Sequence, residues 1–133
     1  MSLSSKEVAR KHLMLAEGLI KTTNINDPPS EYEIRNAFSR SYYALFHASH
    51  GYLRAAEVDT EVLGKKHGRL HAEMERWLGR SFGQFVRNSY ELRRKSDYEP
   101  AWQVPPDYWV ADRLKAARMQ CYFLIVTAQK LIA

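Results

Sequence analysis

A chain of 133 residues has the length of a single domain, and its hydrophobic fraction of 45% excludes an intrinsically disordered protein. The net charge of +5 permits an anionic partner such as nucleic acid, although many basic proteins bind none. The single cysteine, Cys121, excludes an intrachain disulfide, and no apolar run approaches the length that crosses a bilayer. We therefore expect one soluble, cytoplasmic domain over residues 1–133, with no membrane segment and with Cys121 buried.

Apolar residues recur at helical spacing in almost every segment, and no segment alternates strictly as a strand would. Ser4 or Ser5 can cap a first helix, which ends at "NINDPPS" because two consecutive prolines cannot continue it. Ser30 can cap a second helix that covers about residues 31–56. The first part of the chain therefore predicts two helices joined by a proline-containing link.

The remainder of the chain predicts three further helices. A short helix covers about residues 69–78 after the loop "VDTEVLGKKHG", and another covers about residues 84–95 after the link "GRSFG". The segment "YEPAWQVPPD" breaks the chain with three prolines, and Asp107 can cap a last helix that reaches residue 132. Four long helices and a short one, joined by short or proline-rich links, predict an all-α, up-and-down bundle.

The second predicted helix carries two opposed faces. At about 100° per residue, its apolar face holds Ile34, Phe38, Leu45, Ser49 and Tyr52, with Tyr42 at the edge. The opposite face, which we call the Arg–His face, consists of Asn36, Arg40, Tyr43, His47, His50 and Arg54, with Phe46 on its border. A solvated face favours Glu, Lys and Gln, whereas this stretch contains no Lys. We expect the Arg–His face to be covered by another helix of the chain, by a second subunit or by a ligand.

Arginine and histidine two turns apart supply the chemistry that cleaves an RNA phosphodiester. The guanidinium of Arg40 is permanently cationic and matches phosphate with paired donors. The imidazole of His47 titrates near neutrality and can take or give a proton. Their attachment points lie about 10.5 Å apart along the helix axis, so they only just reach one phosphate. A two-fold dimer that pairs this face with its copy would bring two of each residue together.

The string "SRSYYALFHAS" resembles the signature of HEPN domains (higher eukaryotes and prokaryotes nucleotide-binding). These domains carry an Arg followed four to six residues later by a His, often inside a string like R-x-Y-Y-A-x-F-H, which Arg40 and His47 match. The string "KKHG" with His67 is similar to the family's His-Gly turn before the third helix. The string "LRRKSDY" is similar to its later R-x-x-x-D-Y element, matched here by Arg93, Asp97 and Tyr98.

The resemblance implies a helical bundle that forms a homodimer, with Arg40 and His47 as the catalytic pair in a cleft between subunits. It further implies a metal-independent endoribonuclease without a cofactor, which serves as a toxin beside a nucleotidyltransferase antitoxin or in another defence system. Other members are non-catalytic modules that bind a nucleotide or a partner protein, and an all-helical interaction protein without a ligand is a third hypothesis. Active branches often carry Asn, Asp or His after the Arg, where this chain has Ser41.

Several other residues are open to two interpretations. Five of them are candidates for supporting the pair or binding RNA phosphate: Tyr43, His50, Arg93, Asp97 and Tyr98. His50 also fits a packing or surface role, and Arg93 and Asp97 can pair across one helical turn. Neither Cys nor an acidic residue falls at ligand spacing around His12, His67 and His71, so we expect no metal site. The aromatic residues Trp102, Tyr108 and Trp109 can stack on a base or seal the end of the bundle.

Overall fold

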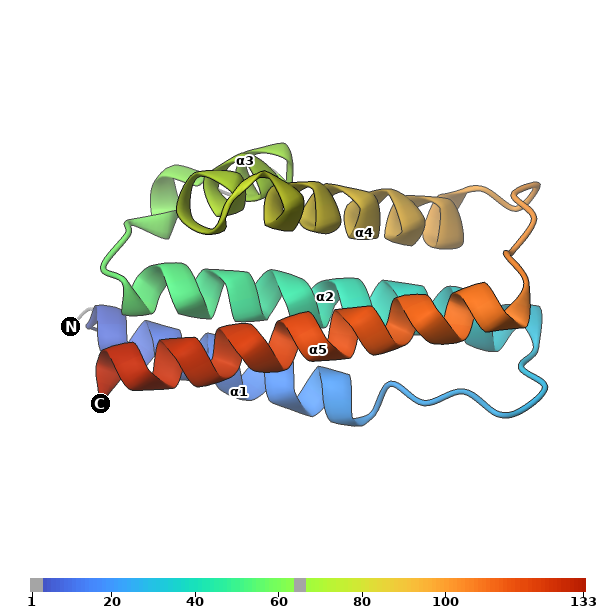
Figure 1. Ribbon diagram of the computed structural model, residues 1–133, viewed down its shortest axis with the longest axis horizontal. Helices are drawn as coiled ribbons and strands as arrows, with labels where there is room; N and C mark the ends of the chain where they lie inside the picture. The colour runs from blue at the N-terminus through green and yellow to red at the C-terminus, as the bar shows by residue number, and fades with distance from the viewer. Residues whose placement is uncertain (1–3, 64–66) are drawn as a thin grey trace.

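The computed structural model describes residues 4–63 and 67–133 and confirms the all-α prediction. The described elements are α1 (Ser5–Lys21), α2 (Glu31–Ala55), the short 3-10 helix η1 (Thr60–Leu63), α3 (His67–Leu78), α4 (Arg80–Tyr98) and α5 (Asp107–Ile132). The four long helices lie side by side, with α1 and α4 running one way and α2 and α5 the other (Figure 1). The short helix α3 folds back against the first part of α4 (Figure 1). The arrangement is an up-and-down bundle.

The first two helices begin where the sequence predicts, because serine caps close their first turns. The backbone N–H of Glu7 donates to Ser4 Oγ at 3.2 Å, which identifies Ser4 as the cap of α1. Ser30 and Glu33 form a reciprocal capping box at the start of α2, in which each side chain accepts from the other residue's backbone N–H. These local hydrogen bonds fix both helix starts.

The prediction that "GRSFG" is a link is wrong, since α4 already begins at Arg80. Gly79, at φ 96°, is the turn residue between α3 and α4. Gly83 lies inside α4, where a Cβ would stand 2.5 Å from Glu75 Cβ and 2.9 Å from the His71 carbonyl oxygen. The second glycine therefore lets two helices approach closely and does not end one. Asp107 was expected to cap α5 but is its first residue, and Pro106 precedes it without a side-chain cap.

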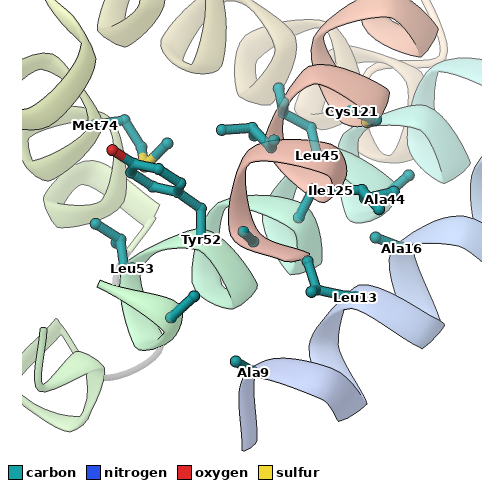
Figure 2. Close-up of a cluster of buried hydrophobic side chains, with 14 of the residues drawn as sticks. Ala9, Leu13, Ala16, Ala44, Leu45, Tyr52, Leu53, Met74, Cys121 and Ile125 are labelled. Atoms are coloured by element: carbon teal, nitrogen blue, oxygen red, sulfur yellow. The ribbon is translucent and has the colours of Figure 1, made fainter. Parts of the chain in front are cut away.

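The main core lies where α1, α2 and α5 meet, with α3 closing it on one side (Figure 2). Leu13 of α1, Leu45 of α2 and Ile125 of α5 point into it, and Met74 of α3 lies near Tyr52 (Figure 2). Every member of the predicted apolar face of α2 is buried, which confirms that prediction. Cys121 is fully buried, as expected, and burial raises the pKa of its thiol to about 12.

A smaller core cluster forms at the other end of the bundle around Ile34, Phe38 and Val110. The Phe38 ring centroid lies 6.3 Å from that of Trp102 and 6.2 Å from that of Trp109. Of the two roles open to these tryptophans, the contacts support sealing the bundle end. Tyr108 takes no part, since it is 73% exposed.

Candidate functional site

The Arg–His face of α2 points away from α5 and lies between α1 and α4. Its position follows from the core, because the opposite face of α2 packs against α5. In Figure 1, α1 and α4 lie on either side of α2. Side chains from both flanking helices reach the Arg–His face: His12 and Thr22 from the α1 side, and Arg93 from α4. Of the three alternatives for what covers this face, the contacts therefore support other helices of the same chain, which cover part of it.

Arg40 is half-buried and bound at the end of α1. Its Nη2 donates to Thr22 Oγ1, and Thr22 is the residue that ends α1. A cation is favourable there because the helix dipole leaves partial negative charge at a C-terminus. The Arg40 Nε is buried and has no hydrogen-bond partner within residues 4–63 and 67–133. Part of the donor set of Arg40 is thus used to hold α1, and part is unmatched inside the described chain.

His47 contacts His12 of α1 through the two Nδ1 atoms, which lie 3.0 Å apart. This distance is that of a hydrogen bond, so one Nδ1 carries a proton and the other accepts it. Burial lowers the pKa of His47, and the ring is therefore neutral at neutral pH. Burial, together with the charges of His47 and Arg54, lowers the pKa of His12 to about 4.

His50 completes a cluster of three imidazoles with His12 and His47. It is 6% exposed, and its ring lies 5.3 Å from that of His12 at an interplanar angle of 27°. The Phe46 ring is closer still, at 4.4 Å between centroids. These contacts support the packing interpretation of His50 over a role as a surface residue.

Tyr43 brings the second group of candidate residues onto the same face. Arg93 Nη2 donates to the Tyr43 hydroxyl, and the Arg93 guanidinium also lies 5.2 Å from the Tyr43 ring centroid. Arg93 and Asp97 pair across one turn of α4, at 3.3 Å from Nε to Oδ2, as the spacing predicted. Asp97 in turn accepts from Ser39 Oγ at 3.3 Å. Arg93 is 9% exposed, so this network joins α4 to α2.

The remaining candidates are placed less centrally. Tyr98 is 67% exposed at the end of α4, and the Arg93 guanidinium lies 5.6 Å from its ring centroid. Of the "KKHG" string, residues 65 and 66 lie outside the described residues, and His67 is the first residue of α3. Among the residues that the structure describes, no group of three His, Cys, Asp or Glu side chains is placed to hold a metal ion.

Sequence reasoning missed His12 as a partner of His47. The spacing considered for a metal site related His12 only to His67 and His71, which both lie on α3. The available signal was its position at the edge of the apolar stripe of α1, which is formed by Ala9, Leu13, Ala16 and Ile20. A histidine beside a core stripe packs against a neighbouring helix, but the spacing cannot say against which residue.

Comparison with protein-family models, with curated proteins and with solved structures finds no match to this chain. None of the described helices is long and apolar enough to cross a membrane.

Proposed function

We propose that this chain is a HEPN-type, metal-independent endoribonuclease in which Arg40 binds the scissile phosphate and His47 transfers the protons. One observation carries the proposal: both residues lie on the Arg–His face, and Nδ1 of His47 is hydrogen-bonded to His12. Burial lowers the pKa of His47, which favours the neutral imidazole. A neutral ring whose Nδ1 is engaged has Nε2 left for chemistry. Arg40 supplies a fixed cation on the same side of the helix.

The proposed reaction needs no group beyond these side chains and the RNA. His47 Nε2 takes the proton of a ribose 2′-hydroxyl, and the 2′-oxygen attacks the adjacent phosphorus. The bond from phosphorus to the 5′-oxygen of the next nucleotide breaks, and that oxygen receives a proton from an imidazolium. The products are a 2′,3′-cyclic phosphate and a free 5′-hydroxyl. Arg40 would stabilise the negative charge that builds on the phosphate oxygens.

The proposal includes a two-fold dimer, since the 10.5 Å estimated along the axis between attachment points is long for one phosphate. Pairing the Arg–His face with its copy would place the His47 of one subunit near the Arg40 of the other. Such pairing would cover aromatic groups on and beside the face, namely the half-buried Tyr43 and Phe46 and the exposed Tyr98. The resemblance to HEPN toxins extends the proposal to a nucleotidyltransferase partner that silences the enzyme.

The test is cleavage of RNA in the presence of EDTA by the wild-type chain, by His47→Gln and by Arg40→Gln. Loss of a general acid–base lowers cleavage by about 10²- to 10⁴-fold, and we expect a comparable loss without the Arg40 charge. His71→Gln and Arg87→Gln are matched controls, because these residues lie on α3 and α4 away from the Arg–His face. Both should cleave like wild type. Cleavage that survives His47→Gln, or that needs a divalent ion, would refute the proposal.

The alternative is a non-catalytic module that binds a nucleotide or a partner protein. Two arginines that could bind RNA phosphate already make hydrogen bonds within the chain, which favours this alternative. Arg40 donates to Thr22, and Arg93 donates to Tyr43. In that case wild-type protein would bind labelled RNA or nucleotide without cutting it, and Arg40→Gln would weaken the binding.

A further inference from the structure

The contact between His12 and His47 limits the protonation states that the two rings can share. A separation of 3.0 Å between the two Nδ1 atoms requires one N–H and one lone pair. If both rings were fully protonated, two N–H groups would point at each other. The geometry therefore allows the pair at most one extra proton, and the two rings titrate as a unit.

The surroundings of the two rings decide which ring accepts the hydrogen bond between the Nδ1 atoms. The half-buried ring of His12 faces three basic side chains of α2, namely His47, His50 and Arg54. A charge on His12 would be opposed by burial and by the charges of His47 and Arg54, which together lower its pKa to about 4. For His47, burial is the cause that lowers the pKa. Because His12 has the additional positive charge of Arg54 beside it, the shared proton is favoured on His47, and His12 Nδ1 is the acceptor.

The ring of His12 also packs against a second imidazole, that of His50. His50 stacks on it at 5.3 Å, and Phe46 packs on His50 at 4.4 Å. The His12 ring also makes a tilted contact with the His47 ring, at 5.3 Å between centroids. These ring contacts restrict rotation of the His12 side chain, so its Nδ1 is held against Nδ1 of His47.

We propose that His12 is the positioning residue of the proposed ribonuclease: its Nδ1 accepts the Nδ1–H of His47 and thereby reserves His47 Nε2 for proton transfer. This inference rests on the proposed function. The Nδ1–H bond to His12 is present both when His47 Nε2 is a bare base and after Nε2 has gained the 2′-hydroxyl proton. The imidazole can then pass that proton on without turning. His12 thus plays the part of an orienting acceptor, as a carboxylate does in other nucleophile–histidine sites.

The first experiment measures the tautomer of His47 and needs no RNA. Imidazole nitrogen NMR of the ¹⁵N-labelled full chain is compared among the wild type, His12→Asn and His12→Leu, with His71→Asn as the control. Wild type should show neutral His47 protonated at Nδ1. His12→Asn should keep that tautomer, since the asparagine amide oxygen can accept in place of Nδ1. His12→Leu removes the acceptor, so the proton should move to Nε2 and the pKa of His47 should fall.

The second experiment measures RNA cleavage by the same four proteins over a range of pH. We expect His12→Leu to lose about 10- to 100-fold in rate, the loss typical when a group that orients a functional histidine is removed, and its pH profile to shift to lower pH. His12→Asn should recover most of the loss, and His71→Asn should match wild type. A rate loss without a shift in the pH profile would mean that His12 is merely structural.

The two experiments separate the two proposals. If the wild-type chain cuts no RNA, the proposed function fails, and the NMR result alone decides whether His12 orients His47. If wild-type His47 carries its proton on Nε2, the positioning role is overturned whatever the activity. This measurement stands even if His12→Leu does not fold, because it uses the unsubstituted protein.

Discussion

Replacing Gly83 with alanine tests how closely α3 and α4 pack. The added Cβ would lie 2.5 Å from Glu75 Cβ and 2.9 Å from both Glu75 Cα and the His71 carbonyl oxygen. These distances are shorter than van der Waals contact. Two of the three atoms belong to the backbone of α3, so no rotamer change can remove the clash. The two helices would have to separate.

The expected magnitude is a difference between two opposing terms. Alanine in a helix interior gains about 1 kcal/mol over glycine from helix propensity. Overpacking a tight interface costs about 1–3 kcal/mol, and contact with backbone atoms favours the upper part of that range. The net effect of Gly83→Ala is therefore a loss of about 1–2 kcal/mol in the free energy of unfolding.

Gly18→Ala is the matched control, because Gly18 is exposed on α1 and a Cβ there would meet no atom within 4 Å. That variant should gain about 0.5–1 kcal/mol from the propensity term alone. Urea unfolding followed by far-UV circular dichroism measures both. Equal stabilities for the two variants would refute the close approach of α3 to α4.

Three further predictions concern buried groups. In the unfolded chain His12 binds a proton near pH 6.5, whereas in the folded chain its imidazole stays neutral down to about pH 4. The free energy of unfolding should therefore fall as the pH is lowered through this window. Urea titrations should show a smaller fall in His12→Asn. The Cys121 thiol should resist iodoacetamide at neutral pH and react once urea unfolds the chain, since it is fully buried; rapid labelling of folded protein would contradict its burial. Tyr43→Phe removes the hydroxyl that accepts from Arg93 and should cost about 1–2 kcal/mol in thermal or urea unfolding, whereas Tyr32→Phe, on a residue 77% exposed, should change little.

The helices and their inward faces could be predicted because they depend on short-range sequence. The serine caps of α1 and α2 act within one turn, and the apolar face of α2 follows from the rise and angle per residue. The error at "GRSFG" has a tertiary cause. A glycine that ends a helix and a glycine that admits a neighbouring helix look alike in sequence, and only the packing of α3 on Gly83 separates them.

The partners of the Arg–His face could not be predicted, because they depend on how three helices are arranged. The spacing of Arg40 and His47 predicts that they share one side of α2. It does not predict that α1 lies beside them. His12 and His47 are 35 residues apart, and Tyr43 and Arg93 are 50 apart. The pair Arg93–Asp97 was foreseen because its members lie on one helix, whereas the contact of Arg93 with Tyr43 was not.

The proposed cleft also restricts which dimers are compatible with the proposed function. The outer surface of α5 exposes an apolar row, Met119, Tyr122, Phe123 and Val126, at helical spacing. This surface is an obvious place for association, but the Arg–His face of α2 points away from α5. A dimer joined through α5 would hold its two Arg40–His47 pairs on opposite outer sides, where they could not share a phosphate. Dimerisation alone therefore does not support the ribonuclease proposal, which requires contact through the Arg–His face, with Tyr43, Phe46 and Tyr98 in the interface.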